Sequence, residues 1–295
     1  MRKLAVLLLG LTALTASGAD LPAINSPATT ESHPGKFIWG DLFTSDPAAA
    51  RDFYTGLFGW SAAVIERPTL LGIRHYIVLS AGNRPIAGIV KREASSGDEI
   101  HGRWVGFISV PDVGQALAAV TAGGGKALSG PKGRPARGTQ AIFSDPDGAT
   151  LGLIHSSSGD PGDYLPDIGD WTWAELFARD PAAAGAFYRA VAGYDVVPDA
   201  RDGRPNSFVL TSGGYSRAAL NPLPDRPKAR PVWLLFVRVA SVKDASAKAV
   251  GLGGRVLVAP SDTPSKYWRA IIADPTGAPL GLVELGDAAQ GRESP

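Results

Sequence analysis

The sequence predicts an α+β protein in which one domain occurs twice in tandem. Two observations support this prediction. The chain aligns with itself over most of its length, and each copy alternates strand-like runs with segments bounded by helix start and stop residues. A length of 295 residues exceeds the usual size of one domain, so we expect two compact domains with separate cores.

The internal repeat is the basis of the domain prediction. At a shift of 134 positions Trp39 aligns with Trp173, and Asp46–Ala50 aligns with Asp180–Ala184. In the later half of each copy the shift is 129, so the second copy is shorter. Repeats of this length are too long for a solenoid or a propeller blade. Further matched pairs are Phe53-Tyr54 with Phe187-Tyr188, Gly59 with Gly193, Trp104 with Trp233, and Asp145-Pro146-Asp147-Gly148 with Asp274-Pro275-Thr276-Gly277.

Each copy is predicted to consist of two similar halves, each a strand, a helix and further strands. Alternation over Phe37–Phe43 predicts the first strand. Asp46-Pro47 then supplies an N-cap and a first helical residue, and Gly59 follows the expected helix end. The remaining elements of the first copy are strands near 76–79 and 86–90, a strand over 105–110, a helix from Asp112 to the glycines at 123–125, and strands near 141–143 and 150–155.

The chain divides into a leader, two domains and short connecting segments. Arg2 and Lys3 precede an apolar run and small residues, which is typical of a secretory signal peptide over 1–19. We therefore expect a secreted or periplasmic protein. The other predicted segments are a flexible lead-in over 20–36, a first domain over 37–156, a linker over 157–170, a second domain over 171–285 and a tail over 286–295.

Composition narrows the possible partners. A net charge of +1 gives no excess of positive charge for phosphates, so we expect no nucleic-acid partner. No stretch after the leader has the roughly 20 apolar residues of a membrane span. The chain has no cysteine, which excludes disulfides and thiolate metal sites. We expect a monomer or a homodimer that binds a small molecule.

The motifs of the repeat resemble those of the vicinal oxygen chelate superfamily, which includes glyoxalase I, bleomycin-resistance proteins and extradiol dioxygenases. The resemblance covers about 37–156 and 171–285, and it rests on Asp46-Pro47, Phe53-Tyr54, Gly59-Trp60 and Asp145-Pro146-Asp147-Gly148 with their counterparts. It implies two βαβββ modules per copy, curled into a half-open barrel around a concave cleft. Because this fold serves several chemistries and also binding without catalysis, the resemblance does not fix the function.

The same resemblance implies a divalent metal held by His, Glu or Gln on strands that face the cleft. In this chain the corresponding positions carry side chains that cannot donate to a cation. We therefore predict no metal site and no cofactor. The positions are Trp39, Val105 and Gly152 in the first copy, and Trp173, Leu234 and Gly281 in the second.

Alternation along the first strand of each copy predicts an aromatic face with one acid, and the resemblance makes it the cleft face. It consists of Phe37, Trp39, Asp41 and Phe43, and of Trp171, Trp173, Glu175 and Phe177. An acid between rings has a raised pKa, so Asp41 and Glu175 are candidate catalytic or anchoring residues. Their alternative role is structural, as acceptors of backbone or arginine hydrogen bonds. The predicted ligand-binding residues are Trp39, Asp41, Phe43, Trp173, Glu175, Phe177, Tyr215, Trp268 and Arg269.

Three functions follow from this cleft. The first is an exported protein of the glyoxalase and bleomycin-resistance type that binds a small apolar or aromatic molecule without metal. The second is a metal-dependent lyase or dioxygenase with relocated ligands, using Asp41 or Glu175 with His75 or His101. The third is a scaffold whose clefts are filled by their own side chains.

Overall fold

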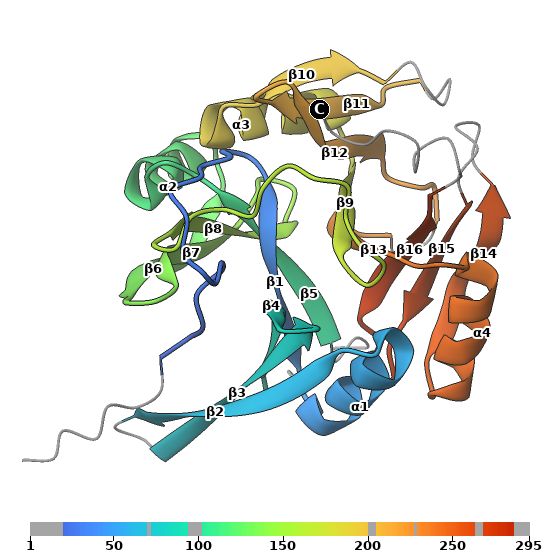
Figure 1. Ribbon diagram of the computed structural model, residues 1–295. Coiled ribbons are helices and arrows are strands. Elements are labelled where there is room, and N and C mark those ends of the chain that lie inside the picture. The colour runs from blue at the N-terminus through green and yellow to red at the C-terminus, as the bar shows by residue number, and fades with distance from the viewer. Residues whose placement is uncertain are drawn as a thin grey trace, which may run out of the picture.

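The computed structural model describes residues 20–69, 72–93, 102–199, 205–226, 229–262 and 268–285. The predicted signal peptide over 1–19 and tail over 286–295 lie outside these residues. The described part contains sixteen strands and four helices in two repeats of the same order (Figure 1).

The first copy contains two modules that each run strand, helix and three strands. The first module consists of β1 (Phe37–Thr44), α1 (Pro47–Phe58), β2 (Ser61–Thr69), β3 (Gly72–Ala81) and β4 (Arg84–Lys91). The second consists of β5 (Gly102–Ser109), α2 (Val113–Ala122), β6 (Lys126–Arg134), β7 (Gly138–Ser144) and β8 (Thr150–Ser156).

The second copy repeats this order. Its first module consists of β9 (Trp171–Ala178), α3 (Pro181–Ala192), β10 (Asp195–Pro198), β11 (Phe208–Ser212) and β12 (Tyr215–Pro222). Its second module consists of β13 (Val232–Arg238), α4 (Val242–Gly251), β14 (Arg255–Asp262), β15 (Trp268–Ala273) and β16 (Pro279–Glu284).

Each copy forms one mixed eight-stranded sheet. The strand orders are β2-β3-β4-β1-β5-β8-β7-β6 and β10-β11-β12-β9-β13-β16-β15-β14, so the two sheets have the same topology. The two modules of a copy meet through the antiparallel pairs β1–β5 and β9–β13. Neither sheet closes on itself, which agrees with the half-open barrels that the sequence predicts. The α+β fold with two tandem domains is confirmed.

The helix boundaries follow from the residues that predict them. The carboxylate of Asp46 accepts a hydrogen bond from the backbone of Ala49, and Pro47 is the first residue of α1. Gly59 ends this helix with a φ of 72°, in the left-handed region, where glycine avoids a steric penalty. Asp180, Pro181 and Gly193 repeat this arrangement around α3.

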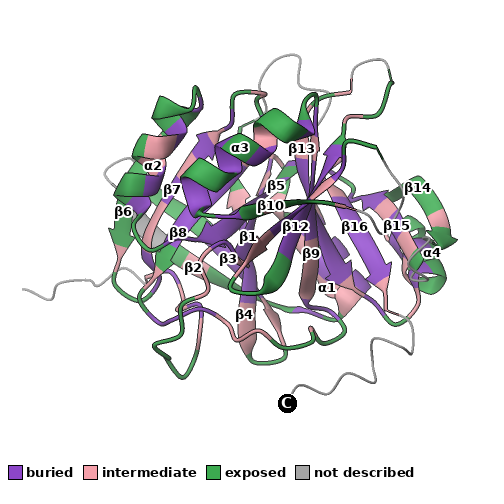
Figure 2. Ribbon diagram, turned by 90° about the horizontal axis from the view of Figure 1, so that it is seen from above, coloured by how far each residue is buried: buried purple, intermediate pink, exposed green. Residues whose placement is uncertain are grey.

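The two copies share one core, which corrects the expectation of separate cores. The largest cluster of buried apolar side chains contains residues of both copies, such as Leu42, Phe143, Leu176 and Leu282. Helix α2 packs beside α3 and α1 packs beside α4, so helices of different copies cover this core together (Figure 1). Figure 2 shows exposed outer faces on α2 and α4 and buried residues on the strands between the helices.

Residues 20–36, predicted as a flexible lead-in, are packed against the first copy. Leu21 and Ile24 are buried in a second apolar cluster that includes Trp39 and Phe107. The backbone amide of Ile24 donates to Ser158 Oγ at 3.0 Å. The Pro, Ser and Thr content of this segment indicated flexibility, but its two aliphatic side chains supply enough apolar surface to dock it.

Candidate functional site

Strand β1 places the indole of Trp39 and the carboxylate of Asp41 on the face of the sheet that lies opposite to the shared core, and we call this face of the first copy the first cleft. The indole Nε1 of Trp39 donates to Asp41 Oδ1 at 2.8 Å. The hydroxyl of Tyr76, on β3, donates to the same oxygen at 2.6 Å. All three side chains are buried. Tyr76 is a site residue that the sequence analysis missed, because only the sheet pairing brings β3 to β1 through β4.

The first cleft is sealed by residues from outside its strands. Arg137, in the turn between β6 and β7, is fully buried with its guanidinium 3.8 Å from the centre of the Trp39 ring. Its Nε donates to the carbonyl of Pro22 at 2.7 Å. Leu21 and Ile24 complete the cover. The aromatic–acid floor of this copy is therefore closed to solvent.

Burial governs the electrostatics of the first cleft. Removal from water raises the pKa of Asp41, and the nearby positive charge of Arg137 and the hydrogen bonds from Tyr76 and Trp39 counteract this only in part. Burial also raises the pKa of the Tyr76 hydroxyl well above its usual range, and the charge of Asp41 adds to that effect. The tyrosine thus remains a hydrogen-bond donor to the acid.

The matching strand of the second copy is β9, and we call its corresponding face the second cleft; its indole, Trp173, is less buried than Trp39. Trp173 and Phe177 are only partly buried, and they pack against a small cluster of Leu234, Phe236 and Val283. Glu175, which lies between Trp173 and Phe177 along the strand, is buried. A guanidinium nitrogen of Arg269, on β15, lies 3.1 Å from Glu175 Oε1. This face therefore combines two partly buried aromatic side chains with an ion pair.

Two residues predicted for the aromatic face point the other way. A β-bulge falls between Phe37 and Trp39, and another falls between Trp171 and Trp173. Phe37 therefore packs against Trp233 in the shared core, with ring centres 5.2 Å apart. Trp171 likewise packs into the shared core. Strict alternation fails at these positions because each bulge adds one residue to the strand.

Tyr215 and Trp268 do not join the second cleft. Tyr215 pairs with Ser212 in the β11–β12 hairpin and lies beside Arg217, 5.1 Å from its guanidinium. Along β15, Arg269 reaches Glu175 whereas Ala270 is buried in the shared core. Trp268 alternates with Arg269, so it lies on the face opposite to the cleft and is largely exposed. Phe43 packs against the first-cleft cluster.

The repeated motif residues hold the two copies together. Trp104 Nε1 donates to the hydroxyl of Tyr54 at 2.8 Å, and that hydroxyl donates to Asp274 Oδ2 of the other copy at 3.0 Å. The second copy makes the same chain with Trp233, Tyr188 and Asp145, at 2.7 and 3.0 Å. The motifs that align the copies in sequence thus form their interface.

Comparison with known proteins agrees with this architecture. Residues 35–153 match the Glyoxalase/Bleomycin resistance protein/Dioxygenase superfamily, and residues 173–283 match the Glyoxalase-like domain. The anthracycline biosynthesis protein DauV of Streptomyces sp. (strain C5) is 30% identical over 266 residues, which cover 86% of this chain and 95% of DauV. The chain belongs to the glyoxalase/bleomycin resistance protein/dioxygenase superfamily.

A second sequence relative and one solved structure are also similar to this chain. The anthracycline biosynthesis protein DnrV of Streptomyces peucetius is 30% identical over 263 residues, covering 85% of this chain and 94% of DnrV. The crystal structure of the Mn(II)-bound glyoxalase from Novosphingobium aromaticivorans has a TM-score of 0.56 and 15% identity, covering 86% of this chain and 83% of that one. At that identity the likeness concerns the fold alone.

The positions at which the superfamily holds a metal do not fit one here. In both copies a phenylalanine ring, Phe107 or Phe236, lies across Gly152 or Gly281. A β-carbon at either glycine would collide with that ring, so no carboxylate side chain fits there without a shift. Among the described residues there is no group of three or more His, Cys, Asp or Glu that could hold a metal ion. The ring pair aligns at the 129-residue shift, a signal that the sequence analysis overlooked.

In the described part of the chain, no histidine of the relocated metal site lies beside Asp41. Tyr76 faces Asp41, so its neighbour His75 points to the opposite face of β3, where it is exposed. His101 lies outside the described residues. Glu175, the other acid of that hypothesis, is paired with Arg269.

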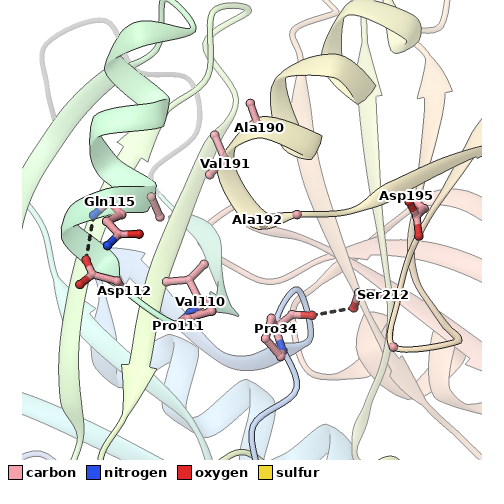
Figure 3. Close-up of a pocket in the computed structure, with 13 residues that line it drawn as sticks. Pro34, Val110, Pro111, Asp112, Gln115, Ala190, Val191, Ala192, Asp195 and Ser212 are labelled. Atoms are coloured by element: carbon pink, nitrogen blue, oxygen red, sulfur yellow. Dashed lines mark hydrogen bonds between the residues drawn. The ribbon is translucent and has the colours of Figure 1, made fainter.

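A groove of about 590 Å³ lies apart from both clefts, between α2 and α3 (Figure 3). Its lining includes Asp112, Asp195 and Ala192. The repeat places Phe58 at the position equivalent to Ala192, and Phe58 packs against the shared core. The small side chain of Ala192 in the second copy thus leaves room that a phenylalanine would fill. None of the predicted site residues lines it.

Proposed function

We propose that this protein binds a planar aromatic molecule in its second cleft, without the metal of its superfamily. One observation carries the proposal. Trp173 stays partly exposed beside a buried carboxylate, whereas its counterpart Trp39 is buried. Mostly apolar clefts with a few fixed polar groups are typical of small-molecule sites. The divergence of the two copies favours the second as the working cleft.

The polar part of the proposed site is the ion pair of Glu175 and Arg269. The side chain of Glu175 is 8% exposed and that of Arg269 is 22% exposed, so the pair lies at the inner side of the cleft. A paired carboxylate and guanidinium present both hydrogen-bond acceptors and donors. The pair would orient a ligand whose ring system lies against the two aromatic side chains.

The relatives support an aromatic ligand. DauV and DnrV are named anthracycline biosynthesis proteins, and anthracyclines carry a flat system of fused rings. Such a ring system matches the aromatic surface of the second cleft. We therefore take an anthracycline as the first probe of ligand binding.

The test is a titration of the full chain with daunorubicin, followed by tryptophan fluorescence. We expect saturable quenching that is unchanged by prior treatment with EDTA, because no metal takes part. Phe177→Ala should weaken binding about five- to tenfold, since it removes ring contact that is worth roughly 1–1.5 kcal/mol. Phe43→Ala, the equivalent change in the first copy, where the indole of Trp39 is buried, is the matched control and should have little effect.

Two outcomes would count against the proposal. If daunorubicin and a wider panel of aromatic compounds cause no saturable change, the second cleft is not an aromatic binding site. If binding requires an ion that EDTA removes, the metal-free part is wrong. Stoichiometric zinc, manganese or iron in the purified protein would lead to the same conclusion.

We also propose that the protein is exported. The support is the charged, apolar and small-residue order of positions 1–19. None of the described helices is long and apolar enough to cross a membrane. N-terminal sequencing of the mature protein from the bacterial host's periplasm or medium should begin at Asp20, and a chain that keeps Met1 inside the cell would contradict export.

A further inference from the structure

The first cleft contains a buried guanidinium that is only partly satisfied. Arg137 has no exposed surface, and its Nε donates a hydrogen bond to the carbonyl of Pro22. Within the described part of the chain neither Nη1 nor Nη2 finds an acceptor. Buried charged donors without acceptors are costly to a fold. This cost would be relieved by an anion at the two nitrogens.

The surroundings of Arg137 specify what kind of anion fits. One face of the guanidinium is covered by the Trp39 ring at 3.8 Å. The nearest acid, Asp41, already accepts hydrogen bonds from Trp39 and Tyr76 on one oxygen. Burial raises the pKa of Asp41 and the charge of Arg137 counteracts this, but no hydrogen bond joins the Asp41 carboxylate to Nη1 or Nη2. The remaining neighbours in the cluster, such as Phe107, are apolar.

The cover over this site is held unevenly. Its later part is fixed by backbone hydrogen bonds from Thr29 to Ser158 and from Asp160 to Glu31, at 2.8 and 2.9 Å. Residues 20–25 are held by the apolar contacts of Leu21 and Ile24 and by hydrogen bonds that involve side chains, including the one from Arg137 Nε to the carbonyl of Pro22. We therefore infer that this stretch is the part of the segment that can move while 29–36 stay anchored.

We propose that the first cleft is a binding site for an aromatic carboxylate, held by Arg137 against Trp39 once residues 20–25 have moved aside. A planar guanidinium binds a carboxylate with two parallel hydrogen bonds, which matches its two free nitrogens. The space vacated by Leu21 and Ile24 is apolar and suits the ring of such a ligand. This site is separate from the second cleft and takes a different chemical class.

Calorimetry with benzoate tests the proposal on the full chain. Benzoate should bind at one site, and its neutral analogue benzamide should bind at least tenfold more weakly. Arg137→Gln should reduce benzoate affinity at least tenfold, whereas Arg179→Gln, at a half-exposed arginine on the surface, should not. Ile24→Ser should increase the affinity several-fold, because it weakens the competing segment. Protein saturated with daunorubicin should still bind benzoate.

Hydrogen exchange provides a readout that does not depend on the stability of a variant. In the native protein, benzoate should accelerate exchange at residues 20–25, whose amides at Ile24 and Asn25 donate to Ser158. Exchange at 29–36 should stay slow. The proposal is overturned if neither the native protein nor Ile24→Ser binds benzoate, if benzamide binds equally well, or if exchange at 20–25 is unchanged at saturation.

Discussion

At the scale of single residues, the interface depends on two buried tyrosines that each connect one copy with the other. Burial raises the pKa of Tyr54 and of Tyr188 well above the usual range, and the charge of the facing aspartate adds to this. Burial also raises the pKa of Asp145 and Asp274. Each tyrosine therefore stays protonated and serves as donor to the acid and acceptor from an indole.

Removing either hydroxyl should weaken the whole protein. Tyr54→Phe leaves Asp274 Oδ2 and the Trp104 indole each without this buried partner, and we expect a loss of about 1–3 kcal/mol of unfolding free energy. Tyr188→Phe should cost a similar amount because its contacts are the same. Urea denaturation measures both, with Tyr164→Phe, at a largely exposed tyrosine, as the control. Unchanged midpoints in both variants would show that these hydrogen bonds contribute nothing.

At the scale of elements, the sequence identified the helices and inner strands but not the outer ones. Helices α1 and α3 carry their own start and stop residues, so local pattern was sufficient. Strands β2 and β6 lie at sheet edges with mostly exposed residues, and they show no burial pattern that a sequence could reveal. The bulges that turn Phe37 and Trp171 away from the clefts are likewise set by strand pairing.

In the candidate site, too, some residues could be predicted from local sequence pattern and others could not. Trp39, Asp41, Trp173 and Glu175 could be found because one strand carries the pattern in both copies. Arg137 could not be found, since it reaches the first cleft from a turn about one hundred residues away and no periodicity marks it. Tertiary packing between distant segments determines which side chains of this kind reach the site, and no local sequence pattern reveals it.

Glycine-to-alanine substitutions at the helix ends should change the stability of the protein in opposite directions. Gly59 and Gly193 have φ angles of 72° and 71°, and a β-carbon there would meet no other atoms. Alanine at either site should therefore cost only the left-handed strain, about 1–2 kcal/mol. Gly251→Ala, at the helical end of α4 without positive φ, should instead stabilise by about 0.4–1 kcal/mol. Thermal unfolding measures these effects, and midpoint temperatures that shift in the same direction for all three alanine variants would contradict the prediction.

At the scale of the whole molecule, Asp163 in the linker joins segments that are far apart in the sequence. Burial alone would raise its pKa, but hydrogen bonds and charge from Arg217 and Lys36 outweigh that effect and lower the pKa to about 2. Lys36 lies 3.0 Å from one oxygen and Arg217 lies 2.9 Å from the other. The segment before the first copy and a hairpin of the second copy thus meet at one carboxylate.

This carboxylate should make the protein sensitive to acid in a defined range. The unfolded-state pKa of an aspartate is about 3.9, so the contribution of Asp163 is fully present above about pH 4. It should be lost as the pH falls from about 4 towards 2, the folded-state value. Asp163→Asn should be less stable at neutral pH and should lose less stability across that range. Asp52→Asn, at an exposed acid, is the control, and equal pH profiles for both variants would refute the assignment.

The crossed tyrosine–aspartate pairs also bear on how two clefts in one chain can differ. Each copy offers the other a tyrosine and an aspartate and receives the same two groups in return. A surface of this kind is self-complementary, as in a dimer of identical subunits related by a twofold axis. In such a dimer every substitution would appear in both clefts at once. Covalent fusion removes that constraint, so one half can keep a partly exposed indole while the other has its indole covered by the segment that precedes it.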